Sequence, residues 1–422
     1  MNYYVRYIDE IIERYRKSTG AIVVVGPKFC GKTTSCNNIA KSIYRINTKA
    51  IVERTAINPK IALEGEEPHL IDEWQKVPDI WNYIKEDLDI DYKFGKYLLT
   101  GSSTPADKTD IQHSGAGRLK MVKMRTMSLF ESKESLGIVS LRSLFENNEF
   151  FPHPNQEQTL EKTAFQICRG GWPLSVLSQE ESTALDVTNS YYDGLFQFAD
   201  GKNEKFRNKK TDYFKTILKS YARNISTSAS MNSMINDVRQ NNERVLDDST
   251  FRDYLEALKD LYIIEDLEAW CPNIRSKTAI SSSPTRHFVD PSIACSALGI
   301  GPKNLINDFN TFGFMFEDLA VRDLRIYSEL LNGTIKHYKD NAGLECDSVI
   351  HLQDGKWAAV EIKLGGEELV NYGAKKLNLL KNKLTTKSDT NPPTFMAIIT
   401  AFGPCYKRED GIYVIPLNCL KD

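Results

Sequence analysis

The stretch that decides the fold is Ala21-Ile22-Val23-Val24-Val25-Gly26-Pro27-Lys28-Phe29-Cys30-Gly31-Lys32-Thr33. Its second part, from the first glycine onward, fits the pattern G-x-x-x-x-G-K-[ST]. The apolar, mostly β-branched run before the pattern is typical of a buried strand, and segment 34–44 after it favours a helix. The alternative is a glycine loop that matches the pattern by chance, but such a loop would not be expected to lie between a strand and a helix. A glycine-rich loop between a strand and a helix therefore predicts a site for the phosphates of a nucleotide.

Each residue type in this loop has a physical role. Gly26 and Gly31 allow the tight turn that points backbone N–H groups at a phosphate. Lys32 adds a mobile cation, and the Thr33 hydroxyl is a ligand for Mg²⁺. We therefore expect ATP and Mg²⁺ to be bound by Gly26, Pro27, Lys28, Phe29, Cys30, Gly31, Lys32, Thr33 and Thr34.

Working outward, segment 2–18 predicts an amphipathic helix, and 49–53 predicts a second strand. Segment 68–73 predicts a third strand that ends in two acids. At the carboxyl end of such a strand, Asp72 would orient Mg²⁺ through water and Glu73 would polarise the attacking water. The alternative is an acidic pair that caps a helix at a surface turn.

Segment 96–103 predicts a fourth strand that breaks at a glycine. Thr100 or Ser102 at its tip would sense the γ-phosphate, although ordinary turn chemistry explains Gly-Ser-Ser almost equally well. The glycine-rich loop 114–118 delivers Arg118. This arginine would neutralise transition-state charge in its own site or in a neighbour's, or it is a solvated surface charge.

The composition is that of a water-soluble globular protein. The 422 residues predict about two or three domains, with 41% apolar and 26% charged residues. No apolar run approaches the roughly 18 residues of a membrane span, and the amino terminus lacks the layout of a secretion signal. Eight cysteines without a C-x-x-C pair point to reduced thiols, and we expect a cytoplasmic location and no membrane partner. The net charge of −2 gives no global attraction to nucleic acid.

The carboxyl-terminal part holds a second constellation. The predicted helix 312–331 contains Glu317, Asp347 enters a predicted strand, and Glu361-Ile362-Lys363 lies on the next strand. This ordered set is typical of the PD-(D/E)xK nuclease arrangement. Glu317, Asp347 and Glu361 would bind Mg²⁺ or Mn²⁺, and Lys363 would activate water or stabilise a phosphate. Such folds also persist as binding modules, so activity is a separate hypothesis.

The middle of the chain is less specific. Segment 248–262 has helical periodicity, and apolar residues over 263–270 follow as wing strands, which resembles a winged helix-turn-helix. The alternative is a plain helical linker domain. Phosphate contacts to DNA would come from Arg239, Arg244 and Arg252, and a basic patch or linker from Lys202, Lys205, Arg207, Lys209 and Lys210.

The motifs together carry a family resemblance. The loop 26–33, Leu70-Ile71-Asp72-Glu73-Trp74-Gln75-Lys76-Val77-Pro78, the segment 97–103, the loop 115–118 and Arg169-Gly170-Gly171-Trp172-Pro173 resemble AAA-type ATPases of bacteria and archaea. Those proteins carry a carboxyl-terminal domain of unknown function. The resemblance implies an ASCE-type P-loop core. The chain lacks the acidic residue expected just after the second strand.

The predicted fold class is α/β, with a helical middle domain. We expect an AAA-type P-loop ATPase domain over 1–185, a helical, winged-helix-like domain over 186–285 and a PD-(D/E)xK nuclease-like domain over 286–422. The first functional hypothesis is an ATPase coupled to a metal-dependent nuclease acting on DNA. The second is a nucleotide-dependent regulatory or defence switch whose last domain binds a partner without cutting. An arginine finger in trans would require a homo-oligomer.

Overall fold

A computed structural model describes residues 3–101, 115–155, 157–197, 211–240, 247–272, 283–387 and 391–422. The chain forms two compact units, Met1–Thr126 with Ala257–Tyr262, and Met127–Glu256 with Ile263–Asp422. The three predicted segments, with boundaries after 185 and 285, do not coincide with these units, and as domains they stay a prediction.

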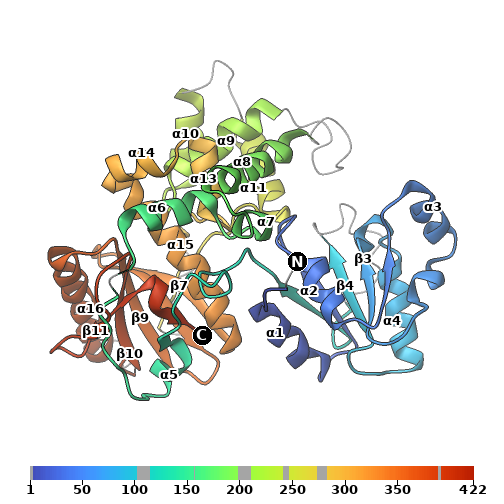
Figure 1. Cartoon of the computed structure of the whole chain (residues 1–422), viewed down its shortest axis with the longest axis horizontal. Coiled ribbons are helices and arrows are strands. Elements are labelled where there is room, and N and C mark those ends of the chain that lie inside the picture. Colours follow the sequence, from blue (N-terminus) through green and yellow to red (C-terminus); the bar gives the residue numbers. More distant parts are fainter. Residues whose placement is uncertain are drawn as a thin grey trace. The chain divides into compact units, whose positions relative to one another are not determined.

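The first unit is built on a parallel sheet (Figure 1, blue). Its strands lie in the order β2–β3–β4–β1–β5, so β4 separates β1 from β3. The strands are β1 (Ala21–Val25), β2 (Ser42–Arg45), β3 (His69–Asp72), β4 (Tyr97–Gly101) and β5 (Leu119–Lys123). The helices are α1 (Tyr7–Arg16), α2 (Lys32–Ile39), α3 (Lys49–Ile57) and α4 (Ile80–Ile90), with short 3₁₀ turns at Pro59–Leu63 and Trp74–Lys76. Because the strands are parallel, the ends of β1, β3 and β4 share one edge of the sheet.

Two local predictions in this unit are wrong. The helix after the loop ends at Ile39, and Ser42–Arg45 is the second strand, paired in parallel with β3. Segment 49–53, predicted as that strand, belongs to helix α3. Its start is fixed by Thr48, whose hydroxyl oxygen accepts a 3.3 Å hydrogen bond from the Ile51 N–H. A three-residue apolar run is too short for its period to separate a strand from a helix.

The helices of the second unit include those of the predicted middle domain. They are α5 (Leu141–Phe145), α6 (Leu160–Arg169), α7 (Pro173–Val176), α8 (Glu181–Gln197), α9 (Thr211–Arg223), α10 (Met231–Gln240), α13 (Pro291–Leu298) and α14 (Pro302–Asn307); α11 (Asp248–Asp260) crosses the unit boundary. Where wing strands were predicted, Ile264 and Leu267 form only isolated bridges to Phe288 and Thr285. The winged helix therefore stays a prediction.

The carboxyl-terminal part of the second unit is a helix followed by a mixed sheet. It contains α15 (Phe309–Leu330), β7 (Gly333–Lys339), β8 (Glu345–Leu352), β9 (Trp357–Lys363), α16 (Glu367–Lys387), β10 (Phe395–Thr400), β11 (Tyr406–Lys407) and β12 (Tyr413–Pro416). The strand order is β11–β12–β10–β9–β8–β7. Strands β7, β8 and β9 are antiparallel neighbours, whereas β10 runs parallel to β9. The predicted helix and the two strands of the hairpin are all present.

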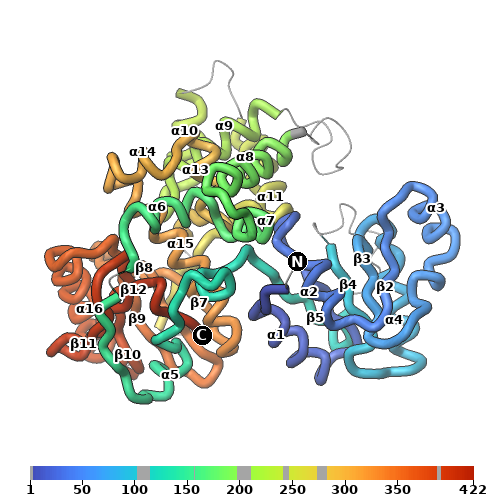
Figure 2. The backbone as a smooth tube through the Cα atoms, viewed as in Figure 1, coloured from blue at the N-terminus to red at the C-terminus, as the bar shows by residue number. Residues whose placement is uncertain are grey.

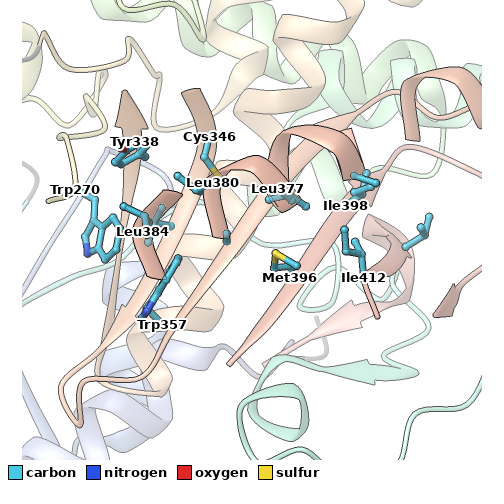
Figure 3. Packing of buried hydrophobic residues seen from close by; sticks show 14 of the residues in the cluster. Trp270, Tyr338, Cys346, Trp357, Leu377, Leu380, Leu384, Met396, Ile398 and Ile412 are labelled. Carbon is cyan, nitrogen blue, oxygen red and sulfur yellow. The ribbon is translucent and has the colours of Figure 1, made fainter. Parts of the chain in front are cut away.

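A hydrophobic core fixes α16 on this sheet. Figure 3 shows Leu377 and Leu384 of the helix with Trp357 of β9 and Trp270 in one cluster, and the two indole rings lie 4.9 Å apart. Burial of large apolar side chains removes them from water and sets the position of the helix over the strands. The strand β13 (Leu420–Lys421) pairs in parallel with β6 (Val139–Ser140). Figure 2 traces the backbone of α16 and of strands β7 to β12 in orange to red.

Candidate functional site

The loop between β1 and α2 adopts a backbone that only glycine fits at its two ends. Gly26 has φ +150°, and a Cβ atom there would lie 2.1 Å from the Met124 carbonyl oxygen. Gly31 has φ +106° and precedes the first turn of α2. The turn directs the free N–H groups of that helix end into the loop, which is the arrangement that binds phosphate.

Lys32 lies inside this loop. Its ammonium donates hydrogen bonds to the carbonyl oxygens of Gly26, at 2.9 Å, and Pro27, at 2.7 Å, and the residue is buried. The flexible lysine stem would carry the charge from these neutral acceptors to a phosphate at the same loop. Of the other predicted loop residues, Cys30 is buried, whereas Lys28 and Phe29 are exposed.

Three predicted residues from three elements meet beside the loop. The hydroxyls of Thr33 in α2 and Thr100 in β4 both donate to Oδ1 of Asp72, at 2.8 and 2.6 Å. Asp72 ends β3 and is buried. A hydroxyl and a carboxylate are oxygen ligands of the kind that Mg²⁺ takes, with water and phosphate oxygens completing its shell. The residues present therefore fit a magnesium ion bound together with a nucleotide.

Glu73 follows Asp72 at the same edge of the sheet. Its backbone is left-handed, with φ +63°, and its N–H donates a 2.9 Å hydrogen bond to the Thr100 carbonyl oxygen. The carboxylate accepts a 2.9 Å hydrogen bond from the Gln75 amide and is partly exposed. A partly solvated carboxylate held next to the predicted metal ligand can accept a proton from water.

Arg118 lies elsewhere. It directly precedes β5, and its carbonyl oxygen accepts a 3.0 Å hydrogen bond from the Ala21 N–H at the start of β1. The side chain forms an ion pair with Asp89 of α4. Since the loop follows the other end of β1, the length of that strand, roughly 15 Å, separates it from Arg118 within one molecule. The structure does not bring Arg118 to the loop of its own copy, and a role in a neighbouring copy stays a proposal.

Several predicted residues lie outside the described residues or away from a site. Ser102, Arg244 and the basic residues Lys202, Lys205, Arg207, Lys209 and Lys210 are outside the described ranges. Arg239 is exposed and pairs with Asp248 at 2.8 Å. Arg252 is also exposed. The predicted contacts of these residues with DNA stay a prediction.

The contact of Arg6 with the loop was not predicted from the sequence. This buried guanidinium donates to the carbonyl oxygens of Cys30, within the loop, and Arg125, just after β5, both at 2.9 Å. Tyr3 nearby contacts the Ser35 hydroxyl of α2 at 2.9 Å. Through these contacts, the segment before α1 packs against the loop and the first helix after it. No motif separates such an arginine from surface arginines, because the contact depends on long-range folding.

In the second unit, the structure gathers the predicted residues of β8 and β9. Lys363 Nζ lies 2.8 Å from Oδ2 of Asp347 and 2.8 Å from Oε2 of Glu361. Oδ2 of Asp347 also accepts a 2.8 Å hydrogen bond from the Ile362 N–H. The antiparallel register explains this meeting, because Ser348 pairs with Val360 and the next residues along are Asp347 and Glu361.

The pKa values show how closely these groups interact. Burial and the negative charge of Asp347 raise the pKa of Glu361 to about 7. Burial also acts to raise the pKa of Asp347, but the ammonium groups of Lys363 and Lys376 outweigh it, so that this pKa is lowered. On α15, the pKa of Glu317 is raised well above its usual range, first by burial and then by Asp347. All the predicted nuclease-like residues therefore share one electrostatic environment.

The structure brings these residues together, but it does not arrange the predicted three carboxylates as a metal centre. Among the described residues, no group of three or more His, Cys, Asp or Glu side chains is placed to hold a metal ion. Instead, Lys376 of α16 lies 2.9 Å from both carboxylate oxygens of Glu361. This ion pair was not predicted from the sequence. The centre formed by Glu317, Asp347 and Glu361 stays a prediction.

Comparison with known proteins identifies the class of the first unit. Residues 18–133 match a family model described as an AAA domain. This match agrees with the loop and with the Thr33–Asp72–Thr100 junction, so that part of the chain is similar to P-loop AAA domains. Residues 160–304 and 312–420 match families described as domains of unknown function, DUF8612 and DUF4143. None of the described helices is both long enough and apolar enough to cross a membrane.

Whole-chain relatives are distant. The uncharacterized proteins Rv2008c of Mycobacterium tuberculosis and Mb2031c of Mycobacterium bovis are each 23% identical over 351 residues, which is 81% of this chain and 70% of theirs. Among solved structures, the Walker-type ATPase PABY2304 of Pyrococcus abyssi is 14% identical with a TM-score of 0.43, over 70% of this chain and 96% of that chain.

Proposed function

We propose that the first unit binds and hydrolyses ATP together with Mg²⁺. The observation that carries this proposal is the convergence of Thr33 and Thr100 on Asp72, beside the loop that contains Lys32. Lys32 would neutralise the outer phosphates, and Thr33 and Asp72 would hold the metal, which supplies charge stabilisation for phosphoryl transfer. Glu73 would take the proton of the attacking water. Thr100, near the end of β4, would sense the γ-phosphate.

The test separates binding from hydrolysis. We expect Glu73→Gln to retain ATP binding and to lose at least about 99% of phosphate release, because general base catalysis contributes roughly 10²–10⁴-fold. Lys41→Ala, at an exposed position after α2, is the control and should keep both ATP binding and phosphate release. Full hydrolysis by Glu73→Gln would remove Glu73 from the mechanism. Absence of ATP binding in the wild type would refute the whole proposal.

We also propose that the carboxyl-terminal part of the second unit cleaves nucleic acid, with DNA as the first substrate to test. The order α15–β7–β8–β9, with β8 and β9 antiparallel, matches the helix and the hairpin predicted for a PD-(D/E)xK arrangement. The placement of Lys363 between Asp347 and Glu361 supports the same proposal. Plasmid and single-stranded DNA and RNA should be cut in Mg²⁺ or Mn²⁺, and Glu361→Ala should abolish cutting.

The control for that experiment is Glu368→Ala, an exposed glutamate on α16. The presence or absence of ATP in the assay shows whether the two sites are coupled. Cutting by Glu361→Ala equal to that of the wild type would refute the nuclease proposal. The second hypothesis, a nucleotide-dependent regulatory or defence switch, would gain if no condition gives cleavage and Glu361→Ala leaves partner binding intact.

Arg118 belongs to the proposal only as a residue that acts in a neighbouring copy. Its position before β5, at the other end of β1 from the loop, and its partly exposed ion pair with Asp89 support this reading. If a homo-oligomer forms, Arg118→Ala should lower hydrolysis per subunit, and mixing it with Lys32→Ala subunits should restore activity. Monomeric protein with full activity would refute this role.

A further inference from the structure

Lys376 is held in the second unit by an unusual contact. It lies on α16, whereas its partner Glu361 is on β9 and is completely buried. The lysine ammonium is 2.9 Å from each carboxylate oxygen of Glu361 and 3.8 Å from Oδ1 of Asp347. This contact joins helix and sheet at the predicted nuclease-like site.

The helix backbone makes this contact possible. Gly373, one turn before Lys376, has no side chain, and a Cβ atom there would lie 3.5 Å from the Cβ atom of Glu361. The helix therefore passes in van der Waals range of the strand residue. From that position, the lysine stem reaches back over Glu361 rather than outward to solvent, and its side chain is only 19% exposed.

The charges of the neighbouring side chains favour a lysine at position 376. When both carboxylates are ionised, Asp347 and Glu361 contribute two negative charges, and Lys363, which bridges them, contributes one positive charge. Lys376 supplies the second positive charge. A buried carboxylate is costly without a compensating cation, so the pair of lysines makes the cluster neutral without any added ion.

The two lysines are not equivalent. Lys363 also donates a 2.9 Å hydrogen bond to the Ile362 carbonyl oxygen, which anchors it to its own strand. Among the described residues, the charged partners that Lys376 contacts are the carboxylates of Glu361 and Asp347. Close by, Oγ1 of Thr400, which pairs in register with Lys363, is a buried oxygen without a hydrogen-bond partner among the described residues.

We propose that the Lys376 ammonium occupies the position at which a divalent cation would bind Asp347 and Glu361, so that a metal ion must displace this lysine to enter. This inference rests on the proposed nuclease-like function and names its regulation. The cluster is an internally neutralised site that excludes cations while α16 holds the lysine in place. A ligand that draws Lys376 away, such as a nucleic-acid phosphate, would open the site to metal.

The test measures metal binding and does not use cleavage. Mn²⁺ is titrated into full-length, nucleotide-free protein, and free Mn²⁺ is followed by electron paramagnetic resonance. Lys376→Gln should bind one Mn²⁺ at least tenfold more tightly than the wild type, and adding Glu361→Gln should abolish that gain. Lys375→Gln, an exposed neighbour on the same helix, should behave as the wild type. Equal affinities of Lys376→Gln and wild type would overturn the proposal.

A second measurement covers the case in which Lys376→Gln does not fold. In the wild type, an amine-acylating reagent should label Lys376 at least tenfold more slowly than the exposed Lys375, as measured by mass spectrometry. Equal labelling rates would overturn the proposal. The two proposals also fail separately, because a variant that binds Mn²⁺ tightly but cuts no nucleic acid would refute the nuclease function and leave this inference standing.

Discussion

The hydroxyl of Thr33 donates a 2.8 Å hydrogen bond to Oδ1 of Asp72, which joins the first turn of α2 to the end of β3. If both oxygens serve a magnesium ion, Thr33→Ala should weaken ATP binding in Mg²⁺ by roughly 10-fold to 100-fold, the effect of losing one charge-assisted contact. Binding measured in EDTA should change little. Thr33→Ser keeps the hydroxyl and is the matched control. The metal role would be contradicted if Thr33→Ala lost the same factor in Mg²⁺ and in EDTA.

A second prediction concerns Lys32, whose ammonium is held by the carbonyl oxygens of Gly26 and Pro27. Removing it with Lys32→Ala should lower ATP affinity about 10-fold to 100-fold, because a charged hydrogen bond to phosphate is lost. Equilibrium binding of a fluorescent ATP analogue measures this. Lys41→Ala tests whether the loss is specific to the loop. Unchanged affinity in Lys32→Ala would contradict the assignment of the loop as the nucleotide site.

A third prediction compares two glycines with positive φ. At Gly26 an added Cβ atom would overlap the Met124 carbonyl oxygen at 2.1 Å, whereas at Gly117 it would meet nothing within 4 Å. Gly117→Ala should therefore cost about 1 kcal/mol of stability from backbone strain alone. Gly26→Ala should cost more than about 3 kcal/mol and abolish ATP binding. Thermal unfolding and ATP titration distinguish the two. Similar losses of stability in both variants would show that backbone strain, and not the clash with the Met124 carbonyl oxygen, causes most of the loss at Gly26.

The meeting of the residues of the candidate nucleotide site was largely predictable, because these residues are close in sequence or end apolar strands. The loop pattern, Asp72 after its strand and Thr100 at the tip of the next all follow from parallel strands that end at one edge. Strand β2 was missed because Ser42–Arg45 is short and only partly buried, so it has no apolar period. The pattern of residues in a run as short as 49–53 does not distinguish a strand from a helix. Here the Thr48 cap at its start favours the helix.

The contacts of Lys376 and Arg6 were not predictable for a different reason. The nuclease-like pattern places Asp347, Glu361 and Lys363 together through one hairpin, whose register the sequence indicates. Lys376 reaches Glu361 only because α16 folds back over β9 at Gly373. Such a contact depends on how a helix packs on a sheet, and a lysine on a helix surface has the same local pattern whether it is solvated or buried.

A fourth prediction concerns acid stability. Burial, with the nearby His287 adding to it, lowers the pKa of His337 from 6.5 to about 4. Between these pH values the unfolded chain binds a proton that the folded chain does not, so stability is greatest above pH 6.5 and falls as the pH drops. At pH 5.5 the loss from this residue is about 1 kcal/mol.

Urea unfolding of the wild type and of His337→Gln, at pH 7.5 and at pH 5.5, measures this contribution. The glutamine cannot titrate, so the variant should lose less stability between the two pH values than the wild type does. The comparison isolates His337 from the other buried histidines, which both proteins contain. Equal losses in the two proteins would mean that His337 is protonated in the folded state.

The last prediction concerns the motif Arg169-Gly170-Gly171-Trp172-Pro173, which binds no predicted ligand. The Gly171 N–H donates a 2.9 Å hydrogen bond to Oδ2 of Asp290, and the same oxygen lies 3.0 Å from the buried Arg322 of α15. Arg322 also pairs with Asp323 at 2.8 Å, and Asp323 accepts a 2.9 Å hydrogen bond from the Leu129 N–H. These bonds indicate that the motif serves the architecture of the second unit.

Replacing the shared cation therefore leaves two buried carboxylates uncompensated. Arg322→Met should destabilise the second unit by about 3–5 kcal/mol, because removing one partner of a buried ion pair exposes the full desolvation cost of the other. Arg142→Met is the control, since Arg142 pairs with Asp422 at 3.4 Å in a partly exposed position and should cost less than about 1 kcal/mol. Urea unfolding of both variants is the measurement. If Arg322→Met is as stable as Arg142→Met, the cluster does not hold the motif, and a binding role for Arg169-Gly170-Gly171-Trp172-Pro173 has to be sought instead.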